Sequence, residues 1–345
     1  MSLQSLSEIE SAASALGNQL SAGINIREAV ARMARLQPKH AEVWQAAAES
    51  ISRGNRLSDQ LTEVWPEAVV AALRAGEESG TIDQVLTRTA MAVRVRLQVR
   101  KVYGKLLSPA ISFGAGVGVL LFFMIAVIPK IAGTLGGGEK SLVFKAAILM
   151  NYIAMNYWPV VAAGVAVVGY MAVIWFKTPE NMDKLVAMGN SQARLGAALR
   201  SLYFGTWAYQ MALLDAAGLP IKQQLQLSVK TLPECYREGV ALMASEVEKR
   251  GIADAADPDK QIEGDPRREW PFYVATAFIT AHETGRVDQE MERCAPILVE
   301  EGIKQLTQVI GVADLFAKMA AAGMISMPLM AYFTQLANSL TKSFS

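Results

Sequence analysis

Three long runs without a charged side chain constrain this chain more than any other feature. They cover residues 106–129, 146–176 and 319–341. Each is long enough to cross a bilayer as a helix, which takes about 20 predominantly apolar residues. The chain as a whole is 52% hydrophobic and only 19% charged, and these runs account for the apolar excess. We therefore expect an integral membrane protein whose remaining residues form polar domains outside the bilayer.

The second run is longer than one span requires. We place transmembrane helices at 106–129, 157–176 and 315–341, and expect Pro328 to bend the third. Residues 130–156 then form a short outer loop. The end of that loop is either an interfacial helix or a tilted extension of the second span.

Basic residues beside the runs predict the orientation, because cytoplasmic segments carry an excess of Lys and Arg. The first run is preceded, and the second and third are followed, by basic side chains: Arg94, Arg96, Arg100, Lys101, Lys105, then Lys177 and Lys184, then Lys342. The outer loop also holds Lys130, Lys140 and Lys145 beside Glu139, so the bias is not absolute. We expect a cytoplasmic N-terminus and, after three spans, a C-terminus on the opposite side.

The polar segments contain an internal repeat. Residues 65–84 read WPEAVVAALRAGEESGTIDQ, and residues 270–289 read WPFYVATAFITAHETGRVDQ. Both segments share Trp-Pro, a Glu, a Gly and Asp-Gln at identical spacing. Upstream, LSAGINIREAV at 20–30 resembles LDAAGLPIKQQL at 214–225 in a register that differs by about ten residues. We assign the difference to a surface-loop insertion at 251–265, which a fold tolerates at small entropic cost.

Such self-similarity predicts one domain used twice, at 1–105 and 177–314. Two copies of one domain fold in the same compartment, so an even number of spans must separate them, and two do. An inverted repeat of the transporter type would place the copies on opposite sides of the membrane.

Each copy is expected to be helical. Apolar residues recur at steps of three and four in 26–33 and in 69–73. Pro66 and Pro271 suit helix starts, while Gly80 and Gly285 close tight turns. No useful stretch alternates with a period of two. The predicted fold class is therefore all-α, with two repeated helical-bundle domains and three transmembrane helices.

Candidate site residues gather at the turn after each repeated helix: Gly76, Glu77, Glu78 and Gly80 in the first copy, Glu283 and Gly285 in the second. The favoured interpretation is structural, with Glu78 and Glu283 accepting backbone N–H bonds at the turn. The alternative is an acidic spot that faces a partner. In the first span, Gly114 and Gly118 have the spacing that lets helices approach closely, either within the chain or in a dimer.

The sequence gives little support for a catalytic, metal-binding, cofactor-binding or nucleic-acid-binding role. His282 beside Glu283 is the strongest acid–base pair, but the first copy has Glu77 in place of the His. Cys235 and Cys294 lie far apart and favour a reducing compartment. We expect no catalytic residue, no metal and no cofactor. The net charge of +1 does not favour a nucleic-acid binder, and no signal peptide is expected at the N-terminus.

Several segments together resemble the type II secretion system F family, the inner-membrane platform proteins of type II secretion and type IV pilus machines. They are LSAGINI at 20–26, GNRLSDQL at 54–61, WP at 65–66, AGEESGTI at 75–82 and VIPK at 127–130. The resemblance covers both copies and all three runs. Two departures are Ser108 before Pro109, where many members have Tyr, and the diverged AHETG of the second copy. The compact form is most similar to members from type IVb pili.

This resemblance implies a six-helix bundle for each cytoplasmic domain and a multi-pass protein of the bacterial inner membrane with a periplasmic C-terminus. It also implies a non-enzymatic role, linking a cytoplasmic assembly ATPase to polymerisation of pilin or pseudopilin. The implied partners are these proteins, other inner-membrane assembly proteins and further copies of the chain. The alternatives are a small oligomeric channel or carrier lined by Asn151 or Asn156, and a membrane enzyme using His282 and Glu283.

Overall fold

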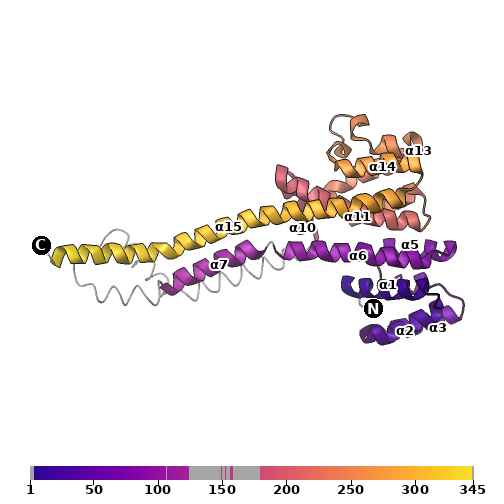
Figure 1. Ribbon diagram of the computed structural model, residues 1–345, viewed down its shortest axis with the longest axis horizontal. Coiled ribbons are helices and arrows are strands. Elements are labelled where there is room, and N and C mark those ends of the chain that lie inside the picture. The colour runs from indigo at the N-terminus through magenta and orange to yellow at the C-terminus, as the bar shows by residue number, and fades with distance from the viewer. Residues whose placement is uncertain are drawn as a thin grey trace. The chain divides into compact units, whose positions relative to one another are not determined.

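The computed structural model describes residues 4–105, 107–123, 149, 152, 156–157 and 179–343. Every regular element in these ranges is a helix (Figure 1). The prediction of an all-α chain is confirmed for this part of the sequence. The predicted second span, 157–176, and most of the outer loop, 130–156, lie outside the described residues.

The helices follow one another with short connections. Those before the apolar runs are α1 (Leu6–Ser21), α2 (Ile26–Leu36), α3 (Ala41–Ser52), α4 (Leu57–Leu61), α5 (Glu67–Ser79) and α6 (Ile82–Gly104). The first apolar run contains α7 (Leu107–Phe122). The later ones are α10 (Pro179–Asn190), α11 (Ala193–Ala216), α12 (Ile221–Ser228), α13 (Glu234–Ala256), α14 (Phe272–Thr284) and α15 (Val287–Ser343). Short 3₁₀ turns are η1 (Pro38–His40), η3 (Val229–Thr231), η4 (Pro258–Lys260) and η5 (Pro266–Glu269).

The chain divides into two compact units. Unit 1 combines Met1–Val102 with Asp183–Leu306, and unit 2 combines Tyr103–Met182 with Thr307–Ser345. Unit 1 therefore contains both copies of the repeated sequence, and α15 runs through both units as one helix.

Local sequence explains where the helices of the first copy begin and turn. Ser5 caps α1 by accepting a bond from the Glu8 N–H, while the Glu8 carboxylate accepts from the Ser5 N–H, which forms a capping box. The Asn25 side chain caps α2. Between these helices Gly23 has φ +82°, as Gly218 does (φ +81°) between α11 and α12. A residue without a Cβ adopts this conformation with little strain.

The core of the first copy surrounds two tryptophans that also form hydrogen bonds. Trp44 and Trp65 are almost fully buried among aliphatic side chains of α1, α2 and α5. The Trp44 indole N–H donates to Gln37 Oε1 at 3.0 Å, and that of Trp65 to Gln4 Oε1 at 2.9 Å. Burial of each ring contributes about 2–3 kcal/mol, and these bonds avoid the cost of an unpaired buried N–H.

The core of the second copy is aromatic. Phe204 lies 5.3 Å from Trp270 and 5.6 Å from Trp207 between ring centroids, and Phe278 lies 5.8 Å from Trp207. Tyr236 completes the cluster at 5.6 Å from Phe204. A Cβ on Gly239 would come within 2.9 Å of Trp270 Nε1, so α13 has no side chain where the indole packs against it.

The two copies meet inside unit 1. Leu213 and Leu214 of α11, and its C-cap residue Ala217, belong to the same buried cluster as the core of the first copy. The Arg88 guanidinium of α6 donates to the Ala212 carbonyl at 3.1 Å and to Asp288 of α15 at 3.0 Å. Arg88 is also 3.4 Å from Glu292. Unit 1 is therefore one folded body built from segments far apart in the sequence.

The predicted insertion at 251–265 is more ordered than a plain surface loop. Gly251, with φ 78° and ψ 165°, interrupts α13, and one further helical turn follows, in which Ala255 and Ala256 are fully buried. Two 3₁₀ turns, η4 and η5, then lead to Trp270. The expectation of a simple loop was wrong because buried apolar side chains fix this segment to the domain.

Among the described residues, one helix is long and apolar enough to cross a membrane, and the stretch that qualifies is Val287–Gly323 of α15. The apolar stretch Ser108–Leu120 of α7 is shorter than that limit. The three-span topology stays a prediction.

Candidate functional site

The repeated turn has the same backbone in both copies. Pro66 and Pro271 are the N-cap residues of α5 and α14, one position before the first helical turn where they were expected. Gly80 (φ +76°) and Gly285 (φ +71°) end these helices in the left-handed region. Their N–H groups donate to the carbonyls of Gly76 and Ala281, a common helix C-cap.

Gly76 has a packing role in the first copy. A Cβ at this position would lie 2.8 Å from Val85 Cγ2, and Val85 is fully buried on α6. Because a β-branched side chain is stiff, it cannot easily move away. Gly76 therefore allows the close approach of α5 and α6 across the turn.

Glu77 is the acidic residue that fixes this turn. Its carboxylate accepts from the backbone N–H of Leu57 at 2.7 Å and from the Ser58 hydroxyl at 2.5 Å. It thus caps the N-terminus of α4, whose preceding residue, Arg56, provides no side-chain cap. A carboxylate at a helix N-terminus also interacts favourably with the helix dipole.

Glu78 does not have the role that was expected of it. Its carboxylate forms an ion pair with Arg56 at 2.6 Å, and its side chain is 57% exposed. The expectation that Glu78 accepts backbone N–H bonds was wrong, because Glu77 points toward α4 and fills that role.

The second copy presents a different surface at the same place. His282 and Glu283 are both exposed at the end of α14. Neither forms a hydrogen bond or ion pair with another described side chain. Where the structure describes side chains, it also contains no group of three or more His, Cys, Asp or Glu residues able to hold a metal ion.

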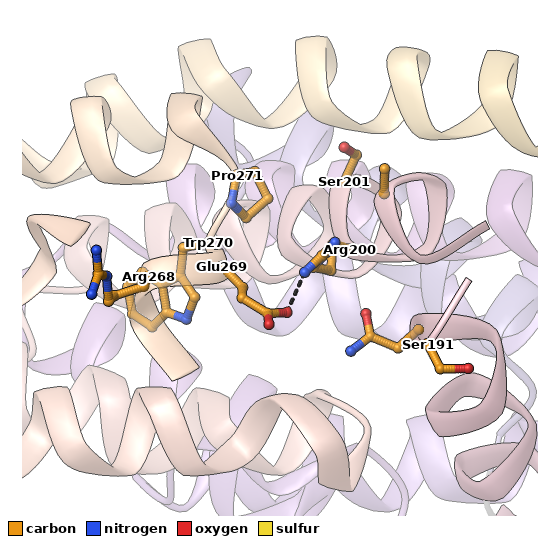
Figure 2. Close-up of a pocket in the computed structure, with 9 residues that line it drawn as sticks. Ser191, Arg200, Ser201, Arg268, Glu269, Trp270 and Pro271 are labelled. Carbon is orange, nitrogen blue, oxygen red and sulfur yellow. Dashed lines mark hydrogen bonds and ion pairs between the residues drawn. The ribbon is translucent and has the colours of Figure 1, made fainter. Parts of the chain in front are cut away.

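An open cavity among the described residues lies beside Trp270. It is about 760 Å³ in volume, and Asn190, Ser191, Arg200, Ser201, Arg268, Glu269, Trp270 and Pro271 contribute to its wall. Figure 2 shows the Glu269 carboxylate directed toward Arg200, with which it forms an ion pair. A second cavity of about 250 Å³ shares Asn190, Arg200, Glu269 and Trp270 with it. We call these two neighbouring cavities together the Trp270 groove.

A buried arginine holds the segment that forms one side of the groove. Arg267 is only 1% exposed and donates to Asp265, to Glu246 and to the Ala255 carbonyl. Hydrogen bonds from Arg267 hold the pKa values of Asp265 and Glu246 below their usual range. A fully paired buried charge of this kind keeps the inserted segment in one conformation.

The predicted packing glycines of the first span differ in their surroundings. Nothing lies within 4 Å of a Cβ placed on Gly114 or Gly118, whereas one on Gly116 would be 2.4 Å from the Cβ of Ala321 on α15. On the same helix pair, Ser112 donates to Asp314 at 3.0 Å. Gly116 is thus the close-contact position within unit 2.

Sequence reasoning missed the Trp270 groove and the Arg267 network. One available signal was the alignment of the repeats, which puts Trp270 opposite Trp65 but Arg268 and Glu269 opposite Glu63 and Val64. A change of charge beside an unchanged Trp-Pro indicates that the two copies differ in what they contact.

Comparisons with known proteins bear on the whole of this arrangement. Residues 12–129 match the model of the family described as type II secretion system (T2SS), protein F. A type IV pilus assembly protein PilC of Thermus thermophilus is 24% identical over 249 residues, which cover 70% of this chain and 60% of the relative. A type II secretion system protein F of Vibrio cholerae is 24% identical over 184 residues, or 51% of this chain and 44% of the relative.

The chain therefore spans less than two thirds of the length of either relative. The domain match and the two relatives agree with the resemblance carried by the GEESG turn and the apolar runs. Residues 12–129 therefore carry the type II secretion system F domain, and the chain resembles proteins of type II secretion and type IV pilus assembly.

Proposed function

We propose that this chain is a non-catalytic platform protein of the bacterial inner membrane. It would link a cytoplasmic assembly ATPase to polymerisation of pilin or pseudopilin subunits in type IV pilus biogenesis or type II secretion. The match of residues 12–129 to the family model and the two named relatives support the general role. The structural observation that carries it is α15, which begins in unit 1 and continues unbroken through its apolar part. This one helix contains both residues packed in unit 1 and a stretch long and apolar enough to cross a bilayer.

The proposal includes a topology. The helical copies at 1–105 and 177–314 lie in the cytoplasm, spans lie at 106–129, 157–176 and 315–341, and 130–156 lies in the periplasm. Alkaline phosphatase fusions after Gly137 and Ser345 should be active, and a fusion after Asp257 inactive. Activity at Asp257, or its absence at Ser345, would contradict three spans with this orientation.

The proposed partner surface is the exposed end of each repeated helix. Glu78 and Glu283 are exposed, one on each repeat copy within unit 1. One platform would therefore offer the ATPase two related contact points. Gly114 and Gly118 are proposed to contact a second copy of the chain, because nothing described packs on them.

Deletion of the gene tests the role. Pilus filaments should disappear in electron micrographs, or pseudopilin-dependent secretion should stop, while prepilin is still cleaved to its mature length. Normal filaments and normal secretion in the deletion strain would exclude the platform role.

A second experiment tests the partners. The full-length tagged protein, extracted in mild detergent, should co-purify with the assembly ATPase of the same strain. The double variant Glu78→Lys, Glu283→Lys should lose the ATPase and remain folded, since both side chains are exposed. Arg53→Gln is a matched control, because Arg53 is 72% exposed and its ion-pair partner is Glu49 in the next helical turn.

A further inference from the structure

The Trp270 groove differs from its counterpart in the first copy because it is open. In the first copy, Gln4 covers the Trp-Pro turn: its Oε1 accepts from the Trp65 indole, and its side chain reaches Gln37. Trp65 is 2% exposed and Gln4 is 5% exposed. The Trp270 indole donates to no described residue, and a cavity of about 760 Å³ lies beside it. Trp270 is itself only 7% exposed and its Nε1 lies against Gly239 of α13, so the copies differ in the partner of the indole N–H and in the cavity beside the second ring.

Hydrogen-bond donors outnumber acceptors in the wall of the groove. Arg200 and Arg268 contribute two guanidinium groups, and Glu269 is the one carboxylate that lines the space. That carboxylate is already paired with Arg200. Asn190 accepts from the Tyr236 hydroxyl at 3.1 Å through Oδ1, which leaves its amide N–H groups as donors. Arg268 is exposed and has no ion-pair partner among the described residues.

The charges of the side chains that line the groove therefore indicate which kind of ligand it binds. A surface with two arginines and one engaged carboxylate favours a ligand with several carboxylate oxygens, since guanidinium–carboxylate bonds are among the stronger polar contacts. The volume lies in the range of pockets that hold an extended organic ligand, and it is much larger than a single small anion needs.

We propose that the Trp270 groove binds an acidic, glutamate- or aspartate-rich segment of a protein partner. Arg268 and Arg200 contact the carboxylates, and the Glu269 carboxylate competes with the ligand for Arg200. The proposal goes beyond the platform role and does not depend on it, because it concerns binding by the purified protein alone.

The test uses purified full-length protein in detergent micelles at low salt, near 50 mM, where charge pairs are least screened. The probe is a fluorescein-labelled ten-residue peptide of alternating Glu and Ser, followed by fluorescence anisotropy. The matched peptide replaces every Glu by Gln. The acidic peptide should bind saturably and about tenfold more tightly than the neutral one, because two or more charge pairs each contribute a few-fold.

Three variants assign the binding to the groove. Arg268→Gln should weaken the acidic peptide about threefold, whereas Glu269→Gln should strengthen it by a similar factor because a competing carboxylate is removed. These opposite changes in affinity distinguish a direct effect on binding from misfolding, because a misfolded variant of either kind would bind the peptide more weakly. Arg53→Gln, on the first copy, removes the same charge from a distant exposed site and should change nothing.

Several results would overturn the proposal. These are no saturable binding, equal binding of the Glu and Gln peptides, or affinities that neither Arg268→Gln nor Glu269→Gln alters. Complete displacement of the peptide by inorganic phosphate at a concentration equal to that of the peptide's glutamates would identify a small-anion site instead. None of these results bears on piliation in the deletion strain, so the two proposals fail separately.

Discussion

The two Trp-Pro helices of unit 1 begin and end with the same backbone conformation and differ in almost every polar contact. Both follow a proline N-cap and end at a left-handed glycine. The first is held by neutral side chains, Gln4 above Trp65, and by the Glu77 carboxylate at α4. The second is held by a buried arginine and by aromatic rings packed edge to face or tilted against one another. Duplicated backbones thus keep the residues that fix turns, while the polar partners around them diverge.

The difference has a physical reason. A helix end that requires φ near +75° restricts the residue to Gly in both copies. A polar group at the helix end can be satisfied by any donor or acceptor that reaches it, so many sequences serve. The second copy has a longer connection before its tryptophan, and that length provides room for Arg267 and the groove.

The largest effect is expected where the copies differ most. Arg267→Leu would leave Asp265, whose side chain is 5% exposed, and Glu246 without their buried cation. Removing one partner of a buried pair costs about 3–5 kcal/mol, so the thermal unfolding midpoint of the purified protein should fall strongly. Trypsin should also cut the 251–265 segment early.

The control for this change is Arg250→Leu. Arg250 also contacts Glu246, but its side chain is 34% exposed, so about 1 kcal/mol or less is expected. Equal effects of the two variants would show that Arg267 has no special role.

Acid should affect the second copy through the same network. The pKa values of Asp265 and Glu246 are lowered, first by hydrogen bonds from Arg267. Folding therefore gains stability above the unfolded pKa values of about 3.9 and 4.3, and loses it as the pH falls through the lower folded-state values. The thermal unfolding midpoint should therefore fall as the pH is lowered below about 5.

The double variant Asp265→Asn, Glu246→Gln isolates this contribution. It should be less stable than the wild type at pH 7 and lose less stability on acidification. Parallel pH curves for the two proteins would assign the acid sensitivity to other carboxylates.

The glycine caps should be equally sensitive in both copies. Gly80→Ala and Gly285→Ala each place a Cβ in the left-handed region, and no neighbour lies within 4 Å of it. Backbone strain alone should cost about 1–2 kcal/mol at each site, measured by denaturant unfolding. Gly104→Ala provides the comparison, since Gly104 is helical without a positive φ and should be neutral or slightly stabilising. Unequal losses at Gly80 and Gly285 would show that one turn has further constraints.

The smallest effects should distinguish the two turns chemically. Glu77→Ala removes the cap of α4 and should cost about 1 kcal/mol. His282→Ala, at the aligned position, should stay within about 0.5 kcal/mol because its side chain is exposed. A larger loss of stability for His282→Ala than for Glu77→Ala would show that the second turn, and not the first, depends on a side chain at this position.

Residues that control the backbone locally were the predictable part of this fold. Pro66, Gly80, Pro271 and Gly285 marked helix ends because their restrictions act within a few residues. The helical class followed from the period of the apolar positions. None of this needs knowledge of a distant neighbour.

Contacts between distant residues were not predictable. Gln4 and Trp65 are 61 positions apart, and no local pattern links them. Arg267 lies in a polar stretch with Asp and Pro that is typical of a surface loop, yet it is buried. Glu77 and Glu78 are adjacent, and only the position of α4 decides which of them caps it. The contact of Gly116 rather than Gly114 or Gly118 likewise depends on where α15 lies.

The discontinuity of unit 1 affects the order in which it is made. Arg88 and its partner Asp288 are separated by 200 positions, and the ribosome adds about 5–20 residues per second. For about 10–40 seconds after α6 leaves the ribosome, its arginine has no carboxylate from α15 to bind. Until α11 has been synthesised, in the earlier part of that interval, the nascent first copy exposes the surface on which α11 later packs. This newly synthesised half-unit is the state in which chaperones and proteases first encounter the protein.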